Sequence, residues 1–251
     1  MGISGYRVPG HGDVWTKDGC QRFVSSHWRL PASKDAMQSF RRAAYTAAQW
    51  PLPRSWARET PPRLPRVIRF VWEMGEGGIE NKDEVIKMLW EVALPLDWRV
   101  RPLGLTLMAP FASQLSSMAQ TGLLVVRHGP LVANAIFLPP GAAVFELIPY
   151  NCEWAGMSEM YANMTQACGD LHHFAWTARD RKWAAYASEA DGRYANWTSD
   201  ECWAKECLVA HERAGMIVDV DAVRSALEVI LPKVSEGASI ERLRQPWPDA
   251  K

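Results

Sequence analysis

The chain has 251 residues, of which 48% are apolar and 10% aromatic, enough for the packed core of one large domain or about one and a half domains of usual size. Its 28 basic and 28 acidic residues give a formal net charge of zero, which argues against diffuse attraction to nucleic acid or to anionic lipid. No apolar run approaches the ~20 residues that span a bilayer, and the first residues lack the apolar core of a signal peptide. We therefore expect a soluble globular chain that binds any anion locally.

The cysteines and two sequons bear on the cellular compartment. No cysteine spacing forms a CxxC pair with a second half, so the sequence predicts no metal site. Sequons begin at Asn163 and at Asn196, and with the later cysteines they suit a secretory-pathway lumen. Chance matches to so short a pattern are the open alternative. The five cysteines are Cys20, Cys152, Cys168, Cys202 and Cys207.

The amino-terminal part differs in composition from the rest. Residues 1–33 show no sustained periodicity and are predicted to be irregular, or the remnant of a longer region, whereas residues 33–49 carry apolar side chains at helical spacing. Five prolines in residues 50–66 predict an extended connection, because proline disfavours helix at its own position and at the preceding one. We therefore divide the chain into an amino-terminal region (1–66), a main domain (67–232) and a polar tail (233–251).

Strand and helix patterns alternate through the main domain, which predicts a parallel sheet with covering helices. Asn81 with Glu84 three residues later indicates the start of a helix. This helix would bury Val85, Met88, Leu89 and Val92. Near the end, Asp221 is predicted to cap a helix that buries Val223, Ala226, Leu227, Ile230 and Leu231 and that Pro232 ends. The expected strands are 67–71, 98–103, 123–126, 142–148 and 171–176; the expected helices are 81–92, 111–119, 131–138, 158–167 and 221–231, and residues 178–199 are expected to form a loop.

The junction after the 123–126 strand is the most informative part of the chain. His128 and Gly129 follow an unbroken apolar run, at the end of the strand where open parallel sheets bind ligands. Glycine allows close approach of the backbone, and the following helix offers amides and a positive dipole end, which suits a phosphate. The alternative is a strand-end histidine that merely bonds a neighbouring carbonyl.

Glu146 lies in an otherwise apolar strand, where a carboxylate needs a partner to offset its desolvation. It could accept hydrogen bonds from a sugar or ribose hydroxyl. The alternatives are that the strand end is exposed at Glu146, or that Glu146 pairs structurally with Arg127.

Other motifs point less clearly to chemistry. The glycines at 75, 77 and 78 match neither the P-loop nor the GxGxxG fingerprint and predict a turn. His172 and His173 should face opposite sides of a strand, which argues against one shared metal. No GxSxG nucleophile context occurs, and most of the 13 tryptophans are expected in the core or at interfaces.

The stretch HGPLVANAIFLPPGAAVFELIPYNCEW, with Gln114 before it and a VDVD segment at 218–221, resembles the HGAGLTN…FLP…AVFEL block of glycosyltransferase family 61. That family includes plant xylan arabinosyl- and xylosyltransferases and an animal EGF-domain-specific O-linked N-acetylglucosamine transferase. The resemblance covers about residues 67–232. It implies the Rossmann-like, donor-binding half of a GT-B glycosyltransferase. The resemblance also implies that the protein acts in the Golgi or endoplasmic reticulum lumen. Membrane attachment would then be only through an amino-terminal anchor, which is missing here.

The resemblance also implies a site and its ligands. His128, Gly129, Asn134, Glu146 and Gln114 would bind a nucleotide-sugar donor, UDP-linked, and a pentose or N-acetylglucosamine would pass to a protein or polysaccharide hydroxyl. No cofactor and no nucleic-acid partner is implied, and the catalytic base stays unassigned.

The sequence departs from the family pattern at the same junction. Pro130, Leu131 and Val132 stand where small residues are usual, and Trp72 with the glycines at 77 and 78 stands where family members have arginines. These departures favour a second hypothesis, a truncated or non-catalytic relative that serves as a binding or structural module. A third, another Rossmann-like enzyme such as a dehydrogenase, is disfavoured by the missing GxGxxG.

Overall fold

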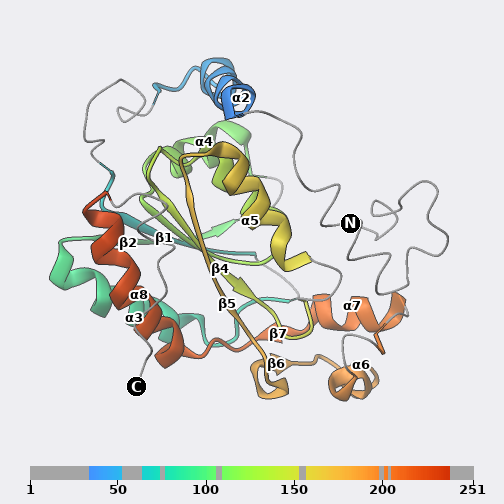
Figure 1. The fold of residues 1–251 in the computed structure, drawn as a ribbon. Coiled ribbons are helices and arrows are strands. Elements are labelled where there is room, and N and C mark those ends of the chain that lie inside the picture. Colours follow the sequence, from blue (N-terminus) through green and yellow to red (C-terminus); the bar gives the residue numbers. More distant parts are fainter. Residues whose placement is uncertain are drawn as a thin grey trace.

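The protein forms a five-stranded parallel sheet with helices on both faces, which confirms the predicted Rossmann-like α/β fold (Figure 1). The computed structural model describes residues 34–52, 64–73, 77–105, 109–152, 157–197, 201–202 and 205–237. The strand order is β2-β1-β3-β4-β5. These strands are β1 (Val67–Glu73), β2 (Arg99–Leu105), β3 (Leu123–Arg127), β4 (Ala143–Ile148) and β5 (His172–Thr177).

Each face of the sheet buries its own apolar cluster, because alternate side chains along a strand point to opposite faces. Ile68, Phe70 and Phe145 pack with helices α3 (Lys82–Ala93) and α8 (Val220–Ser235). Val71, Val126 and the rest of the other face pack with α2 (Lys34–Ala47), α4 (Phe111–Ala119), α5 (Met157–Cys168) and the 3₁₀-helix η4 (Pro130–Phe137). Figure 1 shows α3 and α8 on one side of the sheet and α2, α4 and α5 on the other.

Helix α2 is fixed to the second cluster by polar contacts. Buried Arg41 donates to Asp170 at 2.6 Å and also to the Leu138 carbonyl, and the Tyr45 hydroxyl donates to the Phe137 carbonyl at 2.6 Å. Burial is the main influence on the pKa of Asp170 and raises it, despite the Arg41 guanidinium. The helix predicted for residues 33–49 is thus confirmed, and it packs on the same sheet as the main domain.

The strand order places a topological switch point between β1 and β3. From β1 the chain crosses outward to β2, whereas from β3 it continues the other way to β4 and β5. Ligands of open α/β sheets bind outside the carboxyl ends of strands at such a point. The residues that follow β3, His128 and Gly129, lie at this edge.

A small lobe follows β5 at the carboxyl end of the sheet. The prediction that residues 178–199 form a single loop is wrong, because the described part of this segment contains several short helices and a strand. Short elements break this segment up because local caps stabilise them: Asp180 accepts from the Lys182 amide and Ser188 from the Asp191 amide. The lobe elements are η6 (Arg181–Trp183), β6 (Ala184–Ala185), α6 (Glu189–Gly192), η7 (Arg193–Asn196), α7 (Lys205–Arg213) and β7 (Gly215–Met216), and β6 pairs antiparallel with β7.

Two predictions about α8 are wrong. Asp219, not Asp221, is the cap, because its side chain accepts from the Ala222 amide. Pro232 lies inside the helix, which continues to Ser235. A proline this close to the end removes one backbone hydrogen bond, and the buried Val234 beyond it keeps the last turn on the core.

The start of α3 and the helix after β3 also differ in detail from the predictions. Asn81 precedes α3, but its side chain makes no cap; it donates to the Val218 carbonyl at 2.9 Å and accepts from the Val218 amide at 2.9 Å. Residues 130–137 form a 3₁₀-helix. The four apolar side chains predicted to face inward from α3 are buried.

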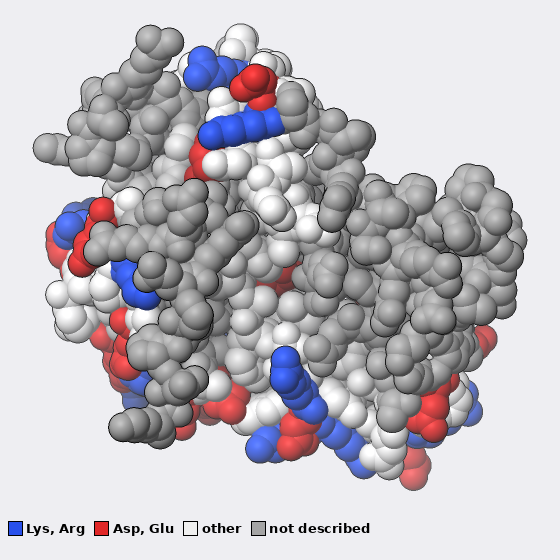
Figure 2. All heavy atoms as spheres, in the orientation of Figure 1, with Lys and Arg blue, Asp and Glu red and all other residues white. Residues whose placement is uncertain are grey.

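Several predictions fall outside the described residues. These are the irregular region 1–33, most of the proline-rich connection, part of the 75–78 turn, Thr198 of the second sequon, and the tail from residue 238. Within the described part of the chain, no helix is long and apolar enough to cross a membrane. On the face shown in Figure 2, described acidic and basic side chains are intermixed, in keeping with the zero net charge.

Candidate functional site

Three side chains from three neighbouring strands meet on one face of the sheet: His128 just after the carboxyl end of β3, Glu146 within β4 and His173 near the amino end of β5. His128 Nδ1 lies 2.5 Å from Glu146 Oε1, and His173 Nε2 lies 2.7 Å from Glu146 Oε2. Because an ionised carboxylate only accepts, both rings donate N–H to Glu146. His128 keeps Nε2, and His173 keeps Nδ1, for other partners.

The sheet register explains why these residues meet. Val126 pairs with Glu146 across β3 and β4, and Glu146 pairs with Ala175 across β4 and β5. Residues two apart on a strand share a face, so His128 and His173 lie on the same face as Glu146. That face is the one covered by η4 and α5, and Tyr161 of α5 packs edge-on to the His128 ring at 5.3 Å between centroids.

The electrostatics of the cluster depend on its burial. Glu146 is fully buried, and the side chains of His128 and His173 are 6% and 12% exposed. Burial alone raises the pKa of the Glu146 carboxyl, but the hydrogen bonds with the two histidines outweigh it, and the pKa lies below its usual value. Glu146 is therefore a charged, oriented acceptor inside the protein.

Gly129 begins the turn after His128 in a conformation that only glycine adopts readily. Its φ is 153° and its ψ is −175°, and a Cβ added there would meet no atom within 4 Å. The side chains of Leu131 and Val132 are buried in the core behind the turn. The apolar side chains at 131 and 132 are therefore accommodated by the core.

The same turn offers fewer amides than the helix that the sequence predicted. Pro130 has no N–H, and the Val132 amide donates to the Gly129 carbonyl at 3.0 Å. Two of the first three helical positions thus cannot give an N–H to a phosphate.

Asn134 and Gln114 form a second pair next to this turn. Asn134 Nδ2 donates to Gln114 Oε1 at 2.9 Å, and Gln114 Nε2 donates to the Ala109 carbonyl at 2.7 Å. Both side chains are half-buried, on packed elements η4 and α4. The structure therefore groups the five predicted donor residues as two hydrogen-bonded pairs, with Gly129 beside His128.

Arg127 does not pair with Glu146 as one alternative supposed. Its guanidinium donates to the carbonyls of Glu212 at 3.1 Å and Ala214 at 3.4 Å, at the end of α7. Gly77, after β1, lies against it, since a Cβ there would be 3.4 Å from both terminal guanidinium nitrogens and 2.8 Å from the Glu212 carbonyl. Arg127 thus brings a positive charge to the switch point and joins it to the lobe. The other alternative, an exposed strand end at Glu146, is also wrong because Glu146 is fully buried.

Sequence reasoning missed His173. The expectation that His172 and His173 face opposite ways agrees with the structure, since only His173 contacts Glu146, while burial lowers the pKa of His172 to about 4. The missing signal was the register between β4 and β5, which sequence periodicity does not give.

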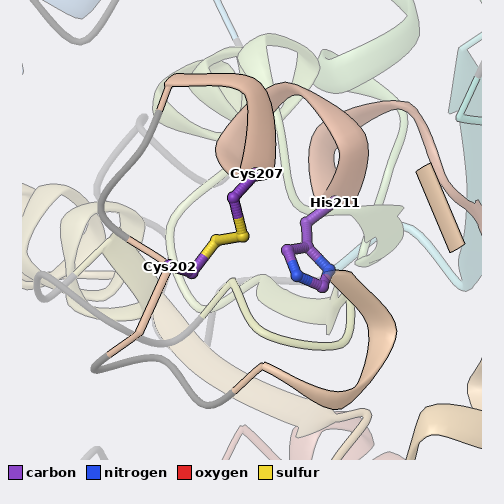
Figure 3. Close-up of side chains that lie close together, drawn as sticks. All are labelled: Cys202, Cys207 and His211. Carbon is purple, nitrogen blue, oxygen red and sulfur yellow. A yellow bond between two sulfur atoms is a disulfide. The ribbon is translucent and has the colours of Figure 1, made fainter. Parts of the chain in front are cut away.

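A second cluster unites residues that the sequence did not connect. Cys202 and Cys207 form a disulfide, and His211 lies beside it, as Figure 3 shows. Cys152 and Cys168 are not disulfide-bonded.

The two sequon asparagines differ in setting. Asn163 is half-buried within α5, and Thr165 of its sequon is buried, with its hydroxyl donating to the Ala162 carbonyl. Asn196 is exposed at the end of η7 and accepts from Arg181 through Oδ1 at 3.0 Å. Glycosylation of either stays a prediction, with Asn196 the more accessible.

Comparison with known proteins gives one partial similarity. The chain is 32% identical over 102 residues to the EGF domain-specific O-linked N-acetylglucosamine transferase of Mus musculus. The match covers 39% of this chain and 17% of that enzyme, so the chain spans about a sixth of its relative's length. No family model matches the chain. The similarity relates this protein to a glycosyltransferase over that part.

Proposed function

We propose that the edge formed by His128, Gly129 and Glu146 binds the diphosphate of a nucleotide sugar and that the protein takes part in glycosyl transfer. The buried His128–Glu146–His173 cluster carries this proposal. A carboxylate is costly to bury, and here its two partners are imidazoles, of which that of His128 borders the ligand edge of the sheet. The partial similarity to a glycosyltransferase supports the same reading.

The chemistry of glycosyl transfer fits this arrangement. Breaking the bond to the sugar leaves negative charge on the departing nucleoside diphosphate, which fixed donors stabilise best. Glu146 orients the His128 ring by holding Nδ1, which leaves Nε2 to face the diphosphate. Gly129 lets the backbone approach a phosphate oxygen, and Arg127 adds a positive charge at the same edge.

Asn134 and Gln114 would position the donor's hydroxyls. Their mutual hydrogen bond leaves Asn134 Oδ1 as an acceptor for a sugar or ribose hydroxyl. We propose a UDP-linked pentose or N-acetylglucosamine as donor and a protein or polysaccharide hydroxyl as acceptor. The disulfide supports a Golgi or endoplasmic reticulum lumen as the compartment, because such bonds persist where conditions are oxidising.

A second function, a non-catalytic module of the same fold, is favoured by the turn itself. Pro130 and the engaged Val132 amide leave a poorer phosphate cradle than a regular helix start would give. On this reading the cluster persists as a structural element, and the protein binds a partner rather than turning over a nucleotide sugar.

Calorimetry with UDP, UDP-N-acetylglucosamine, UDP-xylose and UDP-arabinose tests the proposal, with GDP as the nucleotide control. We expect binding of at least one UDP compound and a loss of about 10-fold or more in His128→Asn, which removes Nε2 from the site. Glu228→Gln, an exposed change on α8, is the matched control. No response to any nucleotide would rule out the donor site, whereas binding without sugar release or transfer would favour the non-catalytic module.

A further inference from the structure

Cys202, Cys207 and His211 bring three metal-binding groups together inside the small lobe. Their two sulfur atoms and one imidazole nitrogen all lie within 4.8 Å of one another, and all three residues are buried. Cys207 and His211 are one helical turn apart on α7, so both project from the same side of the helix, and Cys202 reaches them from the preceding segment (Figure 3). The spacing is Cys-x₄-Cys-x₃-His.

The ligand types select a particular class of cation. Two thiolates and an imidazole suit Zn²⁺ and similar thiophilic ions, and oxygen-preferring ions such as Mg²⁺ and Ca²⁺ do not use such a set. In a tetrahedral zinc site the Zn–S bonds of about 2.3 Å put two sulfurs about 3.8 Å apart. Side-chain rotation in the dithiol form can supply that separation, because α7 already holds Cys207 and His211 in place.

The surroundings of His211 fit the orientation that a metal ligand needs. His211 Nδ1 lies 2.9 Å from the Tyr186 hydroxyl, which leaves Nε2 as the coordinating atom. Metal-binding histidines typically use their second nitrogen in such a hydrogen bond, which fixes the tautomer and the ring. Asn151 Nδ2 is 3.4 Å from Nε2 but donates at 2.7 Å to the Trp197 carbonyl, so the weaker contact can give way to a metal.

We propose that reduced Cys202 and Cys207, together with His211, form a Zn²⁺ site that takes the place of the disulfide. A thiol reductant supplies two electrons and two protons, the S–S bond breaks, and the reductant becomes a disulfide. Zn²⁺ then binds both sulfurs as thiolates and displaces the two protons. The fourth position of the tetrahedron is left for water or another ligand.

Cys202 and Cys207 both belong to the lobe, and His211 beside them links the lobe to the sheet. His211 contacts Tyr150 ring-to-ring at 5.9 Å between centroids, and Asn151 joins the same group, both in the segment that follows β4. Because β4 carries Glu146, the cluster fixes the chain just beyond the candidate donor site. The zinc proposal rests on the cluster alone, not on the proposed function.

Metal titration of the full chain tests the proposal. We expect protein reduced with a phosphine to bind one Co²⁺ per chain with a thiolate-to-cobalt charge-transfer band, and Zn²⁺ to displace it; oxidised protein should give neither signal. Cys202→Ser, Cys207→Ser and His211→Gln should each abolish the band. Tyr186→Phe should weaken Zn²⁺ affinity about 10- to 100-fold, and Cys152→Ser is the matched cysteine control with unchanged binding.

A second measurement works on the wild-type chain, should a variant fail to fold. With the reduced protein, Zn²⁺ should protect Cys202 and Cys207 from alkylation and leave Cys152 unprotected, as mapped by mass spectrometry. No cobalt signal together with no protection would overturn the proposal, and so would a signal that persists without Cys207.

Discussion

The carboxyl edge of the sheet and the small lobe beside it are stabilised in different ways. At the edge, the positions of His128, Glu146 and His173 follow from strand register and from burial in a large apolar cluster. The lobe has a minor apolar cluster of its own, and it depends on a disulfide, local caps and side-chain hydrogen bonds. The His128–Glu146–His173 cluster is thus part of the fold of the sheet, whereas the proposed change of cross-link in the lobe should leave the sheet folded.

Removing Glu146 should have the largest effect. Glu146→Ala leaves two buried imidazoles without their acceptor, and we expect it to lower the free energy of unfolding by about 3–5 kcal/mol. Glu146→Gln keeps one acceptor oxygen and should cost less. Chemical denaturation measures both variants, with Glu228→Gln as control. A cost below about 1 kcal/mol for the alanine variant would show that the edge does not depend on this cluster.

His172 gives the sheet a distinct response to pH. Burial lowers its pKa from 6.5 to about 4, so the unfolded chain takes up a proton in this range and the folded chain does not. The resulting stability is present above pH 6.5 and is lost as pH falls towards 4, by about 2–3 kcal/mol. The pKa of the Glu146 carboxyl is lowered in the folded chain, so the stability that this group contributes is present above its ordinary pKa of 4.5 and is lost only at lower pH.

Denaturation at pH 7, 5.5 and 4.5 checks this expectation. The wild type should lose more stability over this range than His172→Gln, which has no group to protonate there. Parallel curves for the two proteins would show that His172 is not the source of the pH dependence.

Breaking the disulfide should affect the lobe and spare the sheet. The bond joins residues 5 apart, and a loop this short is worth about 2 kcal/mol by chain entropy. In metal-free Cys202→Ala/Cys207→Ala we expect faster amide exchange in α7 and unchanged exchange in β3 and β4, measured by hydrogen exchange. Cys152→Ala controls for the loss of a thiol. Equal acceleration in β3 and β4 would contradict the independence of the two regions.

The sheet was predictable because its signals are local. Unbroken apolar runs placed β3 and β4, helical stripes placed α3 and α8, and their alternation gave the parallel architecture. His128 and Gly129 stood out at the end of one such run, and Glu146 stood out as the polar residue within another. Strand pairing is not a local property, so the contacts of Glu146 with His128 and His173, rather than with Arg127, needed the structure.

The lobe could not be predicted, because its sequence lacks such local signals. Its elements are two to nine residues long, too short for periodicity to distinguish from a loop. Cys202, Cys207 and His211 follow no common zinc spacing, although the Cys-x₃-His step on one helix face was a usable signal. The fold of this part depends on contacts between residues distant in sequence, such as Asn151 with Trp197.

The smallest expected effect lies where the chain leaves the lobe and enters α8. The sequence predicted Asp221 as the cap of this helix, but the residue that accepts from the Ala222 amide, at 3.1 Å, is Asp219. We expect Asp219→Ala to cost about 1 kcal/mol, as the loss of a helix cap does. Asp221→Ala removes only a favourable charge in the first turn and should cost no more than about 0.5 kcal/mol. Thermal and chemical denaturation of the two matched variants measure the difference. A larger cost for Asp221→Ala would mean that the helix is capped two residues later than in the structure.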